Sequence, residues 1–100
     1  MILIGFSSYP MQSAEQVMKR MMELPRLPEY IKGRGNYGYA TKDGGIEGIQ
    51  IYEFDGSKAE EAYEAISEPY TKFADIPGYK MEIRIAVKAR EYVKKYMKSD

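Results

Sequence analysis

The order of two kinds of apolar spacing along the chain most constrains its fold. Apolar residues alternate or run continuously, as in β-strands, over residues 1–7, 35–41, 46–54 and 79–87. Between the first two of these segments, and between the last two, apolar residues recur three or four positions apart, as in amphipathic helices. The sequence therefore predicts an α+β domain with the order strand, helix, strand, strand, helix, strand.

The first predicted helix has signals at both ends. Ser13 and Gln16 have the spacing of a capping box, and Pro25 stops the helix before the linker over residues 25–32. Unbranched thioethers fill irregular gaps in protein cores, so we expect the apolar stripe of this helix to be buried. That stripe consists of Ala14, Val17, Met18, Met21 and Met22.

The second predicted helix begins at Ser57, which forms another capping-box pair with Glu60. Pro69 should break this helix, because its ring clashes with the preceding turn, and residues 70–73 are expected to add one more turn. A last helix is predicted over residues 88–98.

Residues 35–41 and 46–54 are predicted to form a hairpin, because Asp-Gly is a strong turn signal. The expected turn has two residues, Asp43-Gly44 or Gly44-Gly45, whereas a three-residue loop would reverse the pairing of faces. With either two-residue turn, Tyr37 and Tyr39 share a face with Gly48, Gln50, Tyr52 and Phe54. The other face then carries Gly38, Ala40, Ile49 and Ile51.

The first and last strands are expected to differ in position. Residues 1–7 are apolar on both faces, which favours a central strand. The last strand alternates cleanly, with Tyr79, Met81, Ile83, Ile85 and Val87 on one face. Its other face carries Lys80, Glu82 and Arg84, which would protect an edge strand from pairing or, at a barrel mouth, neutralise an acidic ligand.

The predicted order of elements is the split β-α-β arrangement of ferredoxin-like folds. Right-handed crossovers put both helices on one face of the antiparallel sheet and leave the other face bare. A bare face with several aromatic and aliphatic groups marks an interaction surface. We therefore expect a single domain over residues 1–100 that forms a homodimer through its sheets, with an interface of roughly 1,200 to 2,000 Å².

Three segments resemble the dimeric α+β barrel superfamily, and within it the uncharacterised small members. They are the first strand Met1–Ser7, the strand Gly44–Phe54, and Ile76-Pro77-Gly78-Tyr79 before the last strand. The resemblance covers nearly the whole chain and implies a barrel built by two copies. It also implies the cofactor-independent chemistry of the monooxygenases and isomerases in that superfamily. Its monooxygenases often use a His, Asn or Trp in the barrel, and this chain contains no His or Trp.

The absence of both Cys and His excludes thiolate nucleophiles, disulfides, Cys/His zinc sites and His-based triads. With 15 basic and 15 acidic residues, the formal net charge is zero, so no overall field attracts nucleic acid or anionic lipid. No stretch approaches the roughly 20 apolar residues that span a bilayer. We therefore expect no metal, assign no cofactor, expect no nucleic-acid or membrane partner, and predict a cytoplasmic location.

Two motif-like strings overlap before the hairpin. Gly33–Gly38 matches the G-x-G-x-x-G string of dinucleotide-binding loops, but it leads into a strand rather than opening a helix. Arg34–Tyr39 is similar to the aromatic signature of RNA-recognition motifs, yet it has an inserted Asn36 and precedes the hairpin turn. We interpret both strings as a tight turn that leads into a strand.

Ten tyrosines in 100 residues are the compositional feature that most suggests a function. Tyr combines apolar area with a hydroxyl group, which suits both an interface and an amphipathic ligand pocket. We predict a protein that binds a small amphipathic molecule on the sheet face, with the candidates Tyr37, Tyr39, Gln50, Tyr52, Glu82 and Arg84. Two alternatives stay open: a cofactor-independent monooxygenase or isomerase-like enzyme with Tyr or Glu82 as acid or base, and a structural interaction module without a ligand.

Overall fold

The computed structural model describes residues 1–96. Its strands are β1 (Ile2–Pro10), β2 (Lys32–Ala40), β3 (Gly45–Glu53) and β4 (Lys80–Ala86), and its helices are α1 (Ala14–Met22), α2 (Ala59–Ser67) and α3 (Ala89–Tyr96). Short 3₁₀ turns precede α1 (Met11–Ser13), precede α2 (Gly56–Lys58) and follow α2 (Glu68–Phe73). The predicted order of elements is confirmed, and the predicted end of the last helix at Lys98 lies outside the described residues. Within residues 1–96, no helix combines the length and the apolar character needed to cross a membrane.

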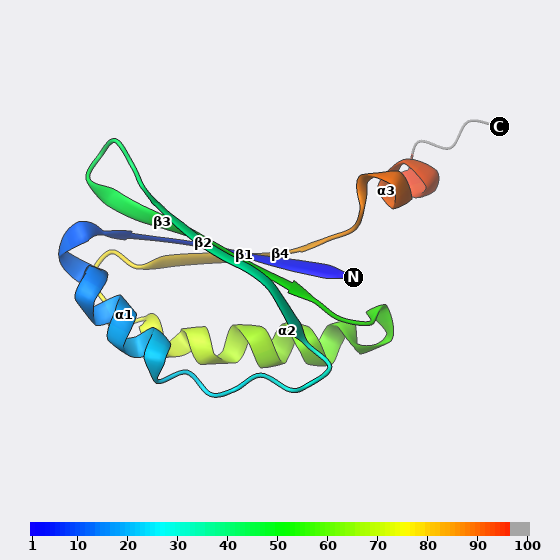
Figure 1. Ribbon diagram of the computed structural model, residues 1–100, viewed down its shortest axis with the longest axis horizontal. Helices are drawn as coiled ribbons and strands as arrows, with labels where there is room; N and C mark the ends of the chain where they lie inside the picture. The colour runs from blue at the N-terminus through cyan, green and yellow to red at the C-terminus, as the bar shows by residue number, and fades with distance from the viewer. Residues whose placement is uncertain (97–100) are drawn as a thin grey trace.

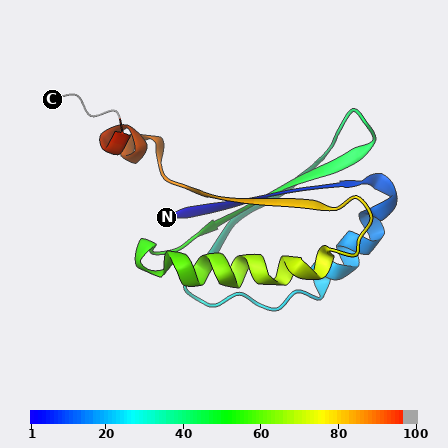
Figure 2. The ribbon, with the colours of Figure 1, turned by 180° about the vertical axis from the view of Figure 1, so that it is seen from behind.

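The four strands form one sheet in the order β2-β3-β1-β4, and each neighbouring pair is antiparallel. β1 is central, as the sequence predicts, and β4 is an edge strand. Both α1 and α2 lie on one face of the sheet, whereas α3 lies beyond the end of β4 on the other side (Figure 1, Figure 2). This arrangement is consistent with a ferredoxin-like fold that carries an added C-terminal helix. We call the face turned away from α1 and α2 the open face.

The core lies between the sheet and the two covering helices as two clusters. The first consists of Leu3, Ile31, Phe54, Ala62 and Ile66, and the second of Val17, Phe73 and Ile76. Tyr70 packs against both clusters. Its ring lies 5.4 Å from that of Phe73, which is itself fully buried. The aromatic residues of the turn after α2 therefore connect the two halves of the core.

Helix α1 is attached to the segment that follows α2. The Ser13 hydroxyl donates a hydrogen bond to the Pro77 carbonyl at 2.7 Å. The Arg20 guanidinium binds both carboxylate oxygens of Asp75, at 2.7 and 2.8 Å, and lowers the pKa of that carboxyl. The capping box predicted at Ser13 is therefore wrong, because its hydroxyl is engaged by a residue distant in sequence rather than by the helix backbone.

The capping box predicted at Ser57 is also wrong. The side chain of Asp55 accepts a hydrogen bond from the Ser57 amide at 2.9 Å, and a 3₁₀ turn separates this cap from α2. The break predicted at Pro69 is confirmed, because the helix changes there into the 3₁₀ turn Glu68–Phe73.

The β2–β3 hairpin closes with a three-residue loop, Lys42-Asp43-Gly44, instead of the predicted two-residue turn. Thr41 donates its amide proton to the Gly45 carbonyl at 2.9 Å, which makes these two residues the last pair before the loop. Gly44 has φ of +82°, a conformation that glycine adopts without steric cost.

This loop reverses the predicted assignment of hairpin faces, because side chains alternate with a period of two. Tyr37 pairs with Ile49, and both belong to the open face together with Tyr39. Gln50 and Tyr52 belong to the face covered by α1 and α2. The predicted grouping of the two hairpin tyrosines with Gln50 and Tyr52 is therefore wrong.

The methionine stripe of α1 is only partly buried. Val17 is in the core, but Met18 and Met22 are 56% and 83% exposed. The prediction that the whole stripe is core is wrong for these two residues, because the contacts of Ser13 and Arg20 hold α1 beside residues 72–77.

We expect Phe73→Ala to lower the free energy of unfolding by about 3–5 kcal/mol, since it empties a fully buried ring position that connects the two clusters. Urea denaturation followed by circular dichroism measures the change. Tyr63→Ala on the exposed side of α2 is the matched control and should change stability by less than about 1 kcal/mol. Equal effects of the two substitutions would contradict this description of the core.

Candidate functional site

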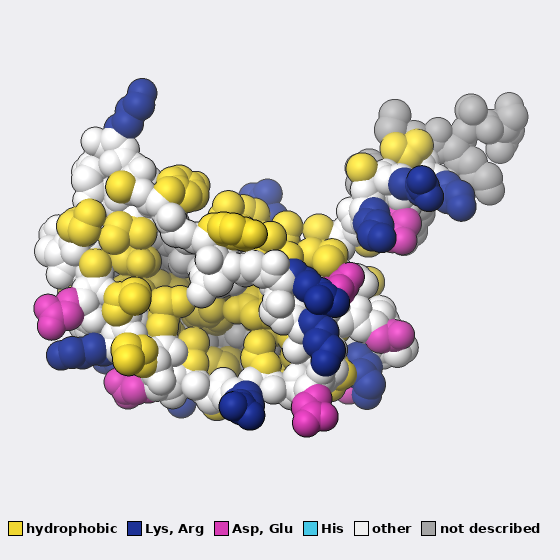
Figure 3. Space-filling model, in the orientation of Figure 1, with side chains coloured by type: hydrophobic (Ala, Val, Ile, Leu, Met, Phe, Trp, Pro, Cys, Tyr) yellow, Lys and Arg dark blue, Asp and Glu magenta, His cyan; other side chains and the backbone are white. Residues whose placement is uncertain are grey.

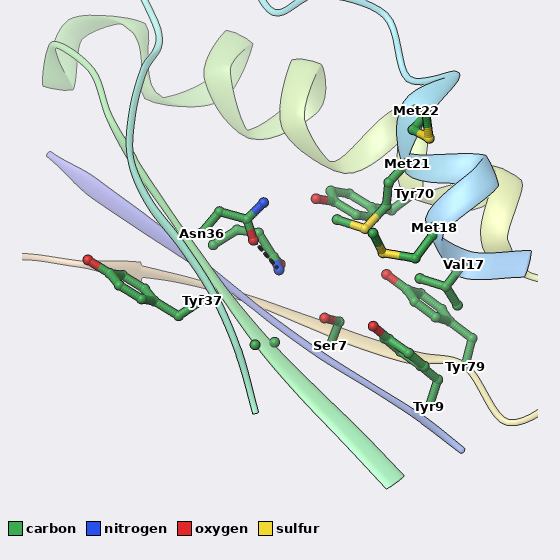
Figure 4. Close-up of a pocket in the computed structure, with 13 residues that line it drawn as sticks. Ser7, Tyr9, Val17, Met18, Met21, Met22, Asn36, Tyr37, Tyr70 and Tyr79 are labelled. Carbon is green, nitrogen blue, oxygen red and sulfur yellow. Dashed lines mark hydrogen bonds between the residues drawn. The ribbon is translucent and has the colours of Figure 1, made fainter. Parts of the chain in front are cut away.

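A cavity of about 360 Å³ opens between α1 and the sheet face that the helices cover. Figure 3 shows apolar side chains gathered in the hollow between the sheet and the helical layer. Met18 and Met21 point from α1 toward the strands (Figure 4). The cavity is lined by Ser7, Tyr9, Val17, Met18, Met21, Met22, Asn36, Tyr37, Gly38, Gly48, Gln50, Tyr70 and Tyr79.

The floor of the cavity is a row of small residues across three strands. Ser7 of β1 pairs with Gly48 of β3, which pairs with Gly38 of β2. A Cβ atom at Gly48 would approach the Ser7 hydroxyl to 2.8 Å and the Gln50 amide nitrogen to 3.0 Å. Glycine at this position therefore leaves room for the two polar side chains on either side of it.

Gln50 is the deepest polar group of the cavity, with 5% of its surface exposed. Its amide nitrogen donates a hydrogen bond of 3.4 Å to the side-chain oxygen of Asn36 (Figure 4). Its side-chain oxygen is buried and has no hydrogen-bond partner among the described residues. A buried acceptor without a donor destabilises the folded state by about 1–3 kcal/mol. A hydrogen-bond donor that reached this oxygen would remove that cost.

Three tyrosines, Tyr9, Tyr70 and Tyr79, lie beside the methionines and across the cavity from Asn36 (Figure 4). Tyr79 stacks on Tyr9 with 6.0 Å between ring centroids, and the Tyr70 hydroxyl lies 3.2 Å from that of Tyr52. Burial raises the pKa of Tyr79 to about 12, and burial together with the Tyr52 hydrogen bond raises the pKa of Tyr70 further. Both phenols are therefore neutral at physiological pH and serve as hydrogen-bond donors rather than as bases.

The open face has a smaller hollow of about 300 Å³ at the other side of the sheet. Phe6 and Tyr39 contribute its aromatic surface, and Glu47, Lys80 and Glu82 contribute charges. Beside it, Arg84 forms an ion pair of 2.9 Å with Glu82, and its guanidinium lies 5.6 Å from the centre of the Phe6 ring. Charged side chains therefore line this hollow, whereas none of the described residues that line the cavity under α1 is charged.

The structure divides the six predicted site residues between the two faces. Gln50 lies at the floor of the cavity on the covered face. Tyr37 belongs to the open face but borders the cavity from β2, with its ring pointing away from the methionines (Figure 4). Tyr52 packs against the first core cluster on the covered face. The remaining three, Tyr39, Glu82 and Arg84, belong to the open face, as Tyr37 does.

Sequence reasoning did not identify Ser7, Met18, Met21, Tyr70 and Tyr79 as site residues. The methionines could have been identified, because three flexible thioether side chains on one short helix are suited to line an adaptable apolar pocket. The sequence does not single out Ser7, Tyr70 or Tyr79 among the other serines and tyrosines. Their positions depend on which residues pair across the strands and on where the chain after α2 returns to the sheet.

Within residues 1–96, no group of three or more acidic side chains has the geometry to hold a metal ion.

Comparison with known proteins shows likeness of fold alone. No family model matches the chain, and no curated protein matches it. The de novo designed protein Foldit4 is similar with a TM-score of 0.52 and 15% identity, over 87% of this chain and 97% of the designed chain. The fold is thus that of a small α+β protein with a four-stranded antiparallel sheet, consistent with a ferredoxin-like arrangement.

Two formyltetrahydrofolate deformylases, from Burkholderia mallei and Pseudomonas putida, are similar with a TM-score of 0.44 and with 6% and 11% identity. The matches cover 85% and 86% of this chain, which spans only 28% and 29% of the deformylase chains. At these TM-scores, the deformylases say nothing about the function of this chain.

We expect Gln50→Leu to leave the free energy of unfolding unchanged or to raise it by about 1 kcal/mol, because it removes a buried acceptor without a partner. Gln50→Glu, which has the same shape, should lower it, because it buries a charge. Urea denaturation of the two variants measures the difference. A comparable loss in both would contradict an unpartnered Gln50 oxygen.

We expect the buried tyrosines to lose their phenolic protons at a higher pH than exposed tyrosines do. The pKa of Tyr79 is about 12 in the folded protein and 10.0 in an unfolded chain. The unfolded state loses this proton first, so the contribution of Tyr79 to stability is constant below pH 10 and falls between about pH 10 and 12. Phenolate absorbance of the folded protein should show a fraction that titrates near pH 12 and that decreases in Tyr79→Phe. Titration of all tyrosines near pH 10 before unfolding would contradict the burial.

Proposed function

We propose that the protein binds a small amphipathic molecule in the cavity under α1 and forms a homodimer through the open faces of its sheets. The observation that carries the binding function is the buried Gln50 side chain, whose oxygen has no partner among the described residues, in a cavity lined mainly by Met, Tyr, Val and Gly. Ligand pockets are typically apolar with a few placed polar groups, and about 360 Å³ is within their usual range.

The residues that line the cavity are suited to a ligand that binds and leaves, because the mouth of the cavity is open to solvent. The buried floor contains Ser7 and Gln50, whereas the mouth is bordered by the exposed Met18 and Met22. Methionines adapt to ligands of different shape because three rotatable bonds separate the thioether from the backbone. The neutral phenols of Tyr70 and Tyr79 favour binding over catalysis, because a general base needs a pKa near the working pH.

The homodimer would cover the open face. This face carries apolar side chains from three strands, namely Ile2, Ile4, Phe6, Tyr37, Tyr39, Ile49 and Ile51. No described helix lies across them (Figure 1, Figure 2). A contiguous apolar surface of this kind marks an interaction site. Two copies of the same face are the most economical cover, because a twofold axis buries both at once.

The charges around the open face are compatible with self-association. Lys80, Glu82 and Arg84 lie on β4, and Glu47 and Glu53 lie on β3 at the other side of β1. The rim therefore carries both signs, so a second copy turned by a twofold axis can place acidic groups opposite basic ones. The resemblance to dimeric α+β barrels supports the same assembly.

Ile49→Glu is expected to convert the dimer into a monomer, because it places a charge at the centre of the proposed interface, between the aromatic side chains of Phe6 and Tyr37. Tyr63→Glu introduces the same charge on the exposed side of α2 and should leave the dimer intact. Size-exclusion chromatography with light scattering gives the masses. A monomeric parent protein at micromolar concentration would overturn the dimer.

Gly38→Val is expected to abolish ligand binding without unfolding the protein. A Cβ atom at Gly38 meets only the Glu47 carbonyl at 3.8 Å, so the side chain fits and fills the cavity floor. The neutral fluorescent probe N-phenyl-1-naphthylamine should gain fluorescence with the parent protein and lose that gain with the variant. Gly33→Val, where a Cβ atom meets nothing within 4 Å, is the matched control outside the cavity. Equal signals from all three proteins would contradict the site.

A further inference from the structure

The cavity under α1 is lined without a single charged side chain. All of its lining residues are Gly, Ser, Asn, Gln, Val, Met or Tyr. The acidic and basic side chains that line a hollow belong instead to the open face and the hairpin tip, at Glu47, Lys80, Glu82, Lys42 and Asp43. The sheet thus separates a neutral site from charged ones.

An ionised ligand would lose hydration in the cavity and gain no counter-charge. The buried floor offers the Gln50 carboxamide and the Ser7 hydroxyl, which are neutral dipoles. Burial also keeps Tyr70 and Tyr79 protonated, so the tyrosine wall adds no charge. Burying an unpaired charge is far more costly than burying a hydrogen-bonded neutral group, so the lining selects against carboxylates, phosphates and ammonium groups.

The hydrogen-bonding groups of the floor specify the polar part of the ligand. The amide nitrogen of Gln50 is bound to Asn36, while its oxygen accepts from no described residue. That oxygen is buried, so an N–H or O–H donor of a ligand would reach it once the carboxamide turns toward the cavity. A site built to pair a ligand donor rejects an analogue that lacks it, because its own polar group then stays unpaired.

The walls specify the apolar part. Tyr9 and Tyr79 present stacked aromatic rings, and Met18 and Met21 present thioethers beside them on the same side of the cavity (Figure 4). Sulfur makes favourable contacts with aromatic rings, and aromatic rings pack well on one another. An aromatic ring system can contact both the tyrosine rings and the thioethers, and so suits this surface better than a branched aliphatic chain.

We infer that the cavity selects an uncharged aromatic molecule whose single hydroxyl or N–H group donates a hydrogen bond to the Gln50 side-chain oxygen. This inference rests on the proposed binding function and narrows it to one chemical class. It excludes aromatic acids of the same size, although these share the ring.

Three probes with one ring system test the inference: naphthalene, 2-naphthol and 2-naphthoate. Binding to the full-length protein near pH 7 is measured by isothermal titration calorimetry or by NMR shifts of the cavity methionine methyl groups. We expect 2-naphthol to bind about tenfold more tightly than naphthalene, as one buried hydrogen bond allows, and at least tenfold more tightly than 2-naphthoate.

The substitution Gln50→Leu separates the hydrogen bond from the ring contacts. In this variant 2-naphthol and naphthalene should bind equally, since the acceptor is gone while the walls remain. Gly38→Val should block all three probes, which ties the binding to this cavity. An unchanged preference for 2-naphthol in Gln50→Leu would overturn the assigned acceptor.

The inference and the proposed function fail in different ways. If 2-naphthoate binds as tightly as 2-naphthol, and Gly38→Val still blocks both, the cavity is a binding site but does not select uncharged ligands. The inference is then overturned, whereas the proposed function is supported. If none of the probes binds the parent protein, both are overturned.

Discussion

The three-residue loop at the tip of the β2–β3 hairpin sets which face each side chain from residue 35 to residue 40 of β2 belongs to. A loop shorter by one residue would shift the pairing and send Gly38 to the opposite face. Only with the observed register do Gly38, Gly48 and Ser7 form a row of small residues beneath α1. The cavity therefore depends on the left-handed conformation of Gly44, which is not itself among the lining residues.

The sequence predicted the features of the fold that depend on local patterns. The order of elements, the central place of β1 and the break at Pro69 follow from periodicity and from proline geometry. The helix caps and the hairpin register were missed because other partners decide them. Ser13 bonds to Pro77, 64 positions away, and the glycines at 44 and 45 are compatible with more than one turn.

The candidate site was predictable only in part, for the same reason. Gln50 and Tyr37 were identified from the sequence and do border the cavity, but Tyr39, Glu82 and Arg84 lie on the open face. Gln50 was identified because it was expected to share a hairpin face with Tyr37 and Tyr39, a grouping that the observed register reverses. The place of Gln50 beneath α1 required knowledge of the register, which periodicity does not supply.

Tyr70 belongs to both core clusters and also borders the cavity. Without a ligand, the two core clusters are in contact through this ring and its aromatic neighbour Phe73. An occupant of the cavity would touch the ring and α1 simultaneously, and so would act as an additional piece of the interior. Its binding free energy would then add to the free energy of unfolding, so that the temperature at which the protein unfolds would rise with the concentration of the molecule.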